Sequence, residues 1–241
     1  MPQRPFYLVL VTPASGSRAR IPRLFLQNIA ASFPTAKIIE FDGDTSSFKP
    51  WLVEQYVPEG AQVIVQPLCI VEGEEYLNLL VALDDQEYKS VRVGFPLLSA
   101  AAGLEKLAGG FFKEQESALA GGCDVVFVGH GSRLKKSEAM YEKLGECLAR
   151  HHPALFAASL KSDFETIVSC LGGRRSVLLI PLLINQYGST WQKIAGPRDD
   201  SLYSRLEARG FACSAASEGL LYSQIVQDVF VDNIRLVLGE M

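Results

Sequence analysis

The sequence predicts an α/β protein made of two similar halves, each a parallel β-sheet with covering helices, which face each other across a cleft. Short apolar, β-branched segments alternate with longer segments of helical period, a pattern typical of parallel sheets that are buried on both faces. A weak internal duplication indicates that this pattern occurs twice. We place the halves at residues 1–117 and 118–241, with the last helix, 220–238, as a candidate to pack back on the first half.

Eight apolar segments are the expected strands, and helices fill the intervals between them. The first helix begins at Ile21 and Pro22, because proline suits a first turn, and it ends before Pro34. The last helix carries an apolar face and ends at Gly239. The expected strands are 6–11, 36–41, 62–71, 91–98, 124–128, 154–160, 176–184 and 211–215.

The duplication is visible where the segment 8–18 is set beside 125–133, because both are a strand that runs into Gly-Ser-Arg. Further along each half, Pro67 in one apolar segment matches Pro181 in another. Ligands of such sheets bind outside the carboxyl ends of the strands, in the crevice between neighbouring loops. The loops expected to converge there are 12–18, 69–75, 129–133 and 185–190.

Composition excludes several classes of protein. The 241 residues are 48% apolar and 21% charged, which is enough apolar side chain for a sizeable core. A net charge of −4 and a pI near 5.5 argue against nucleic-acid binding. No apolar segment reaches the length of about 20 residues that spans a bilayer, and no leader pattern is present, so we expect a cytoplasmic protein without a membrane anchor.

The five cysteines are odd in number and widely spaced, with no CxxC pair. They indicate neither a disulfide framework nor a zinc knuckle. We expect most of them to be small buried hydrophobes.

The sequence Gly129-His130-Gly131-Ser132-Arg133 follows an apolar strand and precedes a helical segment. Its glycines allow close backbone approach, and the free N–H groups of a helix amino terminus attract anions. The His130 imidazole can accept protons or bind a metal ion at such a place. A histidine that only caps the loop explains the same spacing equally well.

This motif resembles the signature of the small chelatases that insert cobalt or iron into sirohydrochlorin. Longer segments are similar to the anaerobic, class II or CbiK-type, branch of the sirohydrochlorin cobaltochelatase family, and they occur in order over nearly the whole chain. These segments are VQPLCIVEGEEY at 65–76, GFPLL at 94–98, VLLIPLL at 177–183, Ile194-Ala195-Gly196 and Glu218-Gly219-Leu220.

The resemblance implies a site of two histidines and a carboxylate that bind the metal ion and remove the pyrrole protons. His130 matches the first histidine and Glu75 is a matching carboxylate, so both are candidate catalytic residues and metal ligands. Ser189 stands where the family has its second histidine, Lys161 where it has another carboxylate, and Cys69 where it has a further histidine. Cys69 is therefore a third candidate ligand, although its apolar neighbours favour a buried thiol.

The resemblance also implies an anionic tetrapyrrole partner and a divalent metal, most simply cobalt, as substrate, with no permanently bound cofactor. We keep a homo-oligomer as an open expectation. Arginines at the Gly-Ser-Arg loops are candidate donors to substrate carboxylates, and Tyr187 and Trp191 can stack on a flat macrocycle, although solvation and core packing explain these residues as well. The candidate substrate-binding residues are Arg18, Gly129, Gly131, Ser132, Arg133, Ser189 and Trp191.

Three functions compete. The first is a sirohydrochlorin cobaltochelatase with His130 as proton acceptor and Glu75 as its partner. The second is a protein on the same scaffold that binds or carries haem or another tetrapyrrole without inserting metal, which the residues at positions 161 and 189 favour. The third is an unrelated α/β protein, which the resemblance over the whole chain argues against.

Overall fold

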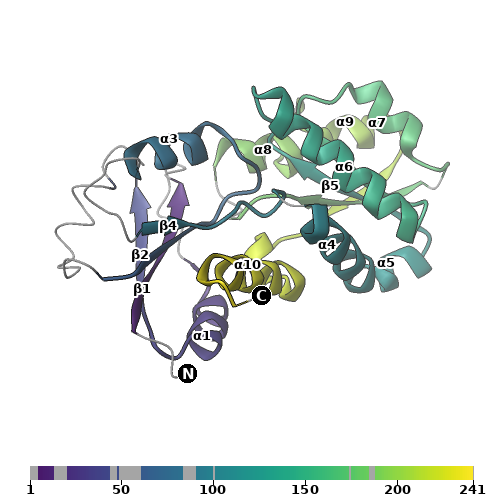
Figure 1. The fold of residues 1–241 in the computed structure, drawn as a ribbon. Helices are drawn as coiled ribbons and strands as arrows, with labels where there is room; N and C mark the ends of the chain where they lie inside the picture. Colours follow the sequence, from purple (N-terminus) through teal and green to yellow (C-terminus); the bar gives the residue numbers. More distant parts are fainter. Residues whose placement is uncertain are drawn as a thin grey trace.

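Two four-stranded parallel sheets, one in each half of the chain, form the framework of the protein (Figure 1). The computed structural model describes residues 5–13, 21–43, 48, 61–83, 91–99, 101–173, 175–184 and 188–240. The first sheet has the order β2-β1-β3-β4 and the second β6-β5-β7-β8. The strands are β1 Phe6–Pro13, β2 Ala36–Gly43, β3 Val63–Pro67, β4 Val91–Val93, β5 Cys123–Gly129, β6 Leu155–Ser159, β7 Ser176–Pro181 and β8 Ala212–Ala215.

The two sheets repeat one topology, which confirms the prediction of two similar parallel-sheet halves. In both, the first strand of the half, β1 or β5, pairs with the second strand on one side and with the third on the other. The register repeats as well, because Val11 of β1 pairs with Pro67 of β3, and Val128 of β5 pairs with Pro181 of β7. The matching prolines of the sequence therefore occupy equivalent places in space.

Helices cover the sheets and begin and end where local chemistry favours it. The last helix is capped by Ser223, whose hydroxyl accepts from the Val226 N–H, and it ends at Gly239 with a left-handed φ of 79°. The first helix follows Pro22 directly. The helices are α1 Arg23–Ser32, α3 Glu74–Leu83, α4 Ala101–Glu114, α5 Glu116–Ala120, α6 Lys135–His151, α7 Phe164–Cys170, α8 Ser189–Ala195, α9 Leu202–Ala208, a 3₁₀ turn Leu220–Tyr222, and α10 Gln224–Leu238.

The strands β1 and β5 are buried on both faces. In β1, Leu8 and Leu10 point into one hydrophobic cluster, whereas Val9 and Val11 point into another beneath α3. The strand β5 alternates in the same way between an inner cluster and an outer cluster covered by α7, α8 and α9. Alternation between two buried faces explains why these strands are continuous apolar runs in the sequence.

The inner faces of the two sheets share one hydrophobic core. This core contains side chains of β1 and α1 from the first half together with side chains of β5 and α6 from the second. Phe111 of α4 stacks on Phe127 of β5, with ring centroids 4.4 Å apart. The two halves therefore do not have separate interiors on this side.

The helices α4 and α10 cover the half of the chain to which they do not belong in sequence (Figure 1). The helix α10 packs on β3 and α1, where Phe230 meets Phe25 edge-on and the Asn28 amide donates to Gln227 at 2.9 Å. The helix α4 packs on α6 as well as on α10. A division of the chain near residue 117 stays a prediction, because α4 links both halves.

Three strands end earlier than the sequence predicts. The strand β3 ends at Pro67, β4 at Val93 and β7 at Pro181, instead of residues 71, 98 and 184. Backbone pairing continues in an irregular form, with the Leu97 N–H donating to the Cys69 carbonyl at 3.0 Å. Proline at 67 and at 96 has no N–H to donate, which interrupts a regular ladder at these positions.

All five cysteines are free. Cys69 and Cys147 are buried, but Cys170 at the end of α7 is exposed, against the expectation of a buried side chain. Within the described residues, no helix combines the length and the apolar character that a membrane span requires.

A pair of glycines in α4 tests the contact between α4 and α10. A Cβ at Gly110 would lie 2.1 Å from the Ile225 side chain of α10, whereas a Cβ at Gly103 would meet nothing within 4 Å. We expect Gly110→Ala to lower the free energy of unfolding by about 1 to 3 kcal/mol, because the helices must move apart. Urea unfolding of both variants measures this.

Gly103→Ala is the matched control in the same helix. It should leave the stability unchanged or raise it by up to about 1 kcal/mol, because alanine favours a helix. Equal stability of the two variants would contradict the close packing of α4 on α10.

Candidate functional site

The loop 129–133 connects β5 to α6 at the carboxyl end of the second sheet. A Cβ at Gly129 would lie 2.1 Å from the Tyr141 ring, so this position has no room for a side chain. Gly131 has a left-handed φ of 85°, and a Cβ there would lie 3.0 Å from the Lys161 side chain. Both glycines of the motif are therefore required by packing and by backbone conformation, whatever the loop binds.

A hydrogen-bond network fixes the loop against the next strand. The Glu138 carboxylate of α6 accepts from the Ser132 N–H at 2.6 Å and from the Ser159 hydroxyl at the end of β6. The Lys161 ammonium donates to the Ser132 carbonyl at 2.6 Å, and the Lys161 N–H donates to the Ser159 hydroxyl at 3.0 Å. Ser132 and Lys161 thus have structural partners that hold the loop in place.

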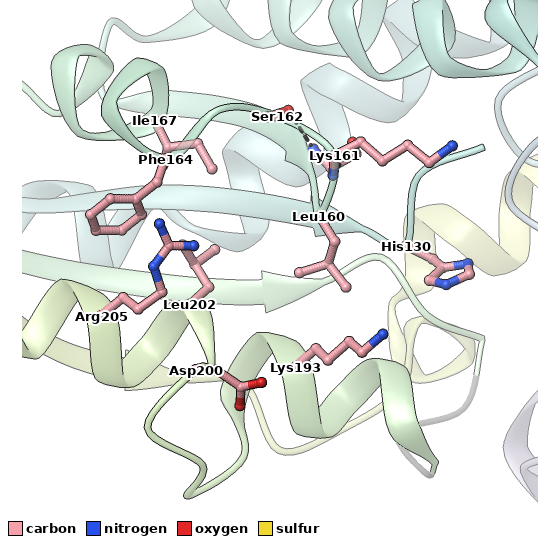
Figure 2. A pocket seen from close by; sticks show the side chains of 11 residues that line it. His130, Leu160, Lys161, Ser162, Phe164, Ile167, Lys193, Asp200, Leu202 and Arg205 are labelled. Atoms are coloured by element: carbon pink, nitrogen blue, oxygen red, sulfur yellow. Dashed lines mark hydrogen bonds between the residues drawn. The ribbon is translucent and has the colours of Figure 1, made fainter. Parts of the chain in front are cut away.

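His130 lies at the exposed end of this loop and lines a cavity of about 320 Å³ (Figure 2). The cavity is bounded by the segment after β6 and by α7, α8 and α9, all from the second half. Its apolar side chains are Leu160, Phe164, Ile167 and Leu202. The exposed imidazole thus stands beside a hollow at the carboxyl ends of β5 and β6.

The amino terminus of α6 contacts the segment 69–75 of the first half. The Ser137 hydroxyl donates to the Glu72 carbonyl at 2.6 Å, and the Lys136 ammonium donates to the Glu72 carboxylate at 3.0 Å. Arg133 and Glu74 form an ion pair at 3.7 Å between two exposed side chains, which contributes little stability. Two of the four loops expected to converge therefore lie side by side, one from each half.

Cys69 lies in this segment but is buried, with 8% of its surface exposed. Burial, followed by the negative charges of Glu75 and Glu72, raises the pKa of the Cys69 thiol far above its usual range. A protonated thiol is a poor metal ligand and a poor nucleophile. The geometry therefore favours the reading of Cys69 as a buried hydrophobe.

Glu75 lies exposed in the first turn of α3, close enough to Cys69 to affect the pKa of the thiol. No three His, Cys, Asp or Glu side chains of the described residues come together as a metal cluster. The roles of His130 and Glu75 as a pair across the cleft stay a prediction.

The other candidate residues are divided between described and undescribed parts of the chain. Ser189 is exposed at the first position of α8. Trp191, one turn into the helix, has a buried indole N–H without a hydrogen-bond partner among the described residues. Arg18 and Tyr187 lie outside the described residues, and so do parts of the predicted loops 12–18 and 185–190.

Sequence reasoning missed four residues of this region. Glu138 and Ser159 organise the loop, and Lys193 and Arg205 add positive charge to the cavity. Glu138 carries a readable signal, because an acidic residue in the first turn of a helix accepts free N–H groups. Lys193 and Arg205 carry none, because nothing in their spacing indicates that α8 and α9 face the same cavity.

Solved structures define the class of protein to which this fold belongs. The cobalt complex of the sirohydrochlorin chelatase SirB from Bacillus subtilis subspecies spizizenii has a TM-score of 0.57, with 14% identity over 96% of this chain and 95% of that chain. CbiX, the terminal enzyme for siroheme biosynthesis in denitrifying bacteria, has a TM-score of 0.62, with 16% identity over 96% of this chain and 98% of that chain. The fold is that of the sirohydrochlorin chelatases.

Sequence similarity identifies the family within this class. The model of the cobalt chelatase (CbiK) family matches residues 39–238, and the chain belongs to that family. The sirohydrochlorin cobaltochelatase CbiKC of Nitratidesulfovibrio vulgaris is 28% identical over 205 residues, which cover 82% of this chain and 72% of that protein. The family resemblance expected from the sequence motifs is confirmed.

The network around Glu138 can be tested by replacing one carboxylate oxygen with an amide. In Glu138→Gln only one acceptor oxygen remains, and the bonds to Ser132 and Ser159 lose the strengthening that a charged carboxylate gives them. We expect the free energy of unfolding to fall by about 1 to 3 kcal/mol and the Ser132 amide to exchange its hydrogen faster. Urea unfolding and NMR hydrogen exchange measure the two effects.

Glu142→Gln is the matched control, since Glu142 is exposed one turn further along α6. It should change neither the stability nor the exchange of the Ser132 amide. Slow exchange at Ser132 in Glu138→Gln would contradict the network.

The burial and protonation of the Cys69 thiol predict its reactivity toward alkylating reagents. Because burial raises the pKa of this thiol, it stays protonated from neutral pH to about pH 9 and should resist alkylation there. Iodoacetamide at pH 8, followed by mass spectrometry, should modify the exposed Cys170 first. Labelling of Cys69 as fast as Cys170 would contradict a buried, protonated thiol and revive its role as a ligand.

Proposed function

We propose that this protein inserts a divalent metal ion, cobalt in the first instance, into sirohydrochlorin. Membership of the cobalt chelatase family supports the reaction, and an exposed imidazole beside a cavity is consistent with it. The observation that carries the proposal is His130, presented at the carboxyl end of β5 by a loop that α6 and β6 hold rigid. A cytoplasmic location and the oligomeric state stay predictions.

Metal insertion sets two chemical demands on the protein. The two pyrrole N–H protons of the macrocycle need acceptors, and the incoming ion must exchange its water molecules for other ligands. His130 can meet the first demand, because a neutral imidazole accepts a proton near neutral pH. Because Glu138 and Lys161 hold the backbone of the loop at Ser132, less of the loop has to be ordered when the flat macrocycle approaches.

Lys161 bears on the choice between insertion and simple binding. A free ammonium group beside the imidazole would repel a divalent ion. In the structure the Lys161 ammonium donates one of its three N–H groups to the Ser132 carbonyl, on the loop itself, and keeps its positive charge. The hydrogen bond gives Lys161 a structural role in the loop, but its charge still disfavours a divalent ion nearby.

A second function is the binding of a tetrapyrrole without insertion. The serine at position 189 and the lysine at position 161, where the resemblance implies a histidine and a carboxylate, favour it. Such a carrier would use the same surface beside His130. The two functions differ in whether metal enters the macrocycle faster in the presence of the protein.

The test is the rate at which cobalt enters sirohydrochlorin, followed by absorbance with the purified protein. We expect a rate well above that of the uncatalysed reaction, and we expect His130→Ala to lower the added rate by about 100-fold or more, because the proton acceptor is lost. His151→Ala is the matched control. Its imidazole is exposed at the end of α6 and stacks on Phe112, so its loss should leave the rate unchanged.

A rate equal to the uncatalysed reaction would exclude insertion. A spectral titration with metal-free sirohydrochlorin then decides about the second function. A shifted absorbance at micromolar protein supports binding alone, and an unchanged spectrum excludes both functions.

A further inference from the structure

The cavity beside His130 is smaller than a tetrapyrrole. At about 320 Å³ it lies at the low end of the range for small-molecule pockets, whereas a macrocycle of four substituted rings is far larger. It can hold one edge of such a molecule, the rest lying outside. His130 lines the cavity, so an edge bound there would bring the body of the macrocycle to the imidazole.

One wall of the cavity is apolar. Phe164 and Ile167 of α7 face Leu202 of α9, and Leu160 closes the end toward β6 (Figure 2). The Arg205 guanidinium lies over the Phe164 ring, 3.9 Å from its centroid. This contact fixes the position of the charged group and leaves its outer edge available to an acceptor.

The opposite wall is positively charged and only partly neutralised. Lys193 of α8 extends toward the His130 end of the cavity (Figure 2) and has no hydrogen-bond or ion-pair partner among the described residues. Asp200 is the carboxylate nearest to it in the cavity wall, but both Asp200 oxygens accept from the Arg198 guanidinium, at 2.8 and 2.9 Å. Arg198 has the larger effect in lowering the pKa of the Asp200 carboxyl, and the Lys193 ammonium lies close enough to help lower it, so one carboxylate is shared by two cations and a positive charge is left over.

Lys193, Arg205 and Lys161 remain as an excess of positive charge around an apolar hollow. Such a combination suits a ligand with an apolar ring and negatively charged arms, since the ring removes apolar surface from water and the arms accept charge-assisted hydrogen bonds.

We propose that this cavity binds one ring edge of the tetrapyrrole substrate, with Lys193 and Arg205 holding the carboxylate arms of that ring. The inference rests on the proposed function, because it assigns the substrate of the same site to a particular surface. Lys193 and Arg205 are binding residues here, and they orient the macrocycle so that its centre comes to His130.

The test is the dissociation constant of metal-free sirohydrochlorin, measured by absorbance for the wild-type protein and for Lys193→Met and Arg205→Met. Methionine keeps much of the apolar stem and removes the charge. We expect each variant to bind about tenfold more weakly, and the affinity of the wild type to fall more steeply with salt than that of the variants. Lys193→Arg should keep most of the affinity, because the charge is retained.

Lys113→Met is the control for the loss of one positive charge, since Lys113 is exposed on α4, away from the cavity. It should bind sirohydrochlorin like the wild type. In the insertion assay, the two cavity variants should raise KM about tenfold with little change in kcat, whereas His130→Ala should lower kcat.

The two proposals fail in different ways. If the wild type does not bind sirohydrochlorin, the proposed function itself is wrong. If the wild type binds it but Lys193→Met and Arg205→Met bind equally tightly, only the assignment of the cavity is wrong, and the charged wall is a solvated surface.

Discussion

The shared hydrophobic core between the two sheets is the constraint on which the rest of the structure depends. Side chains from the inner faces of β1 and β5 are buried in one cluster, together with residues of α1, α4, α6 and α10. Separating the sheets would expose this cluster to water, which is costly in proportion to its apolar area. The carboxyl ends of the strands, and the loops they carry, are therefore held at fixed positions relative to each other.

Upon this framework the loop 129–133 is placed by polar contacts. The Glu138 carboxylate and the Lys161 ammonium bind different backbone groups of Ser132, one an N–H and the other a carbonyl. The carboxylate and the ammonium thus bind the N–H and the carbonyl of the same residue, Ser132. Lys161, where the resemblance of the sequence implies a carboxylate, is in this way part of the support for the loop that carries His130.

Much of the fold could be predicted from the sequence, because the signals are local. All eight expected strands occur, since β-branched apolar runs between helical segments have few other interpretations. The match of Pro67 with Pro181 correctly indicated equivalent positions in the two sheets. The lengths of β3, β4 and β7 were predicted less well, because proline interrupts the ladder without ending the apolar pattern.

The candidate site could be predicted only in part. The motif around His130 was readable because glycine, histidine and a strand end occur together within five residues. The partners of the loop, Glu138, Ser159 and Lys161, come from two elements whose relative position depends on tertiary packing. Lys193 and Arg205 lie on separate helices that meet only in the folded protein, so no periodicity marks them as neighbours.

The position of α10 has a consequence for the order in which the protein can fold. Residues 224–238 are synthesised after both sheets, yet they cover β3 and α1 of the first one. Until these residues leave the ribosome, α10 does not cover the inner face of the amino-terminal sheet. An exposed apolar surface of that kind can associate with other nascent chains. The first half to be made is thus the last to be completed.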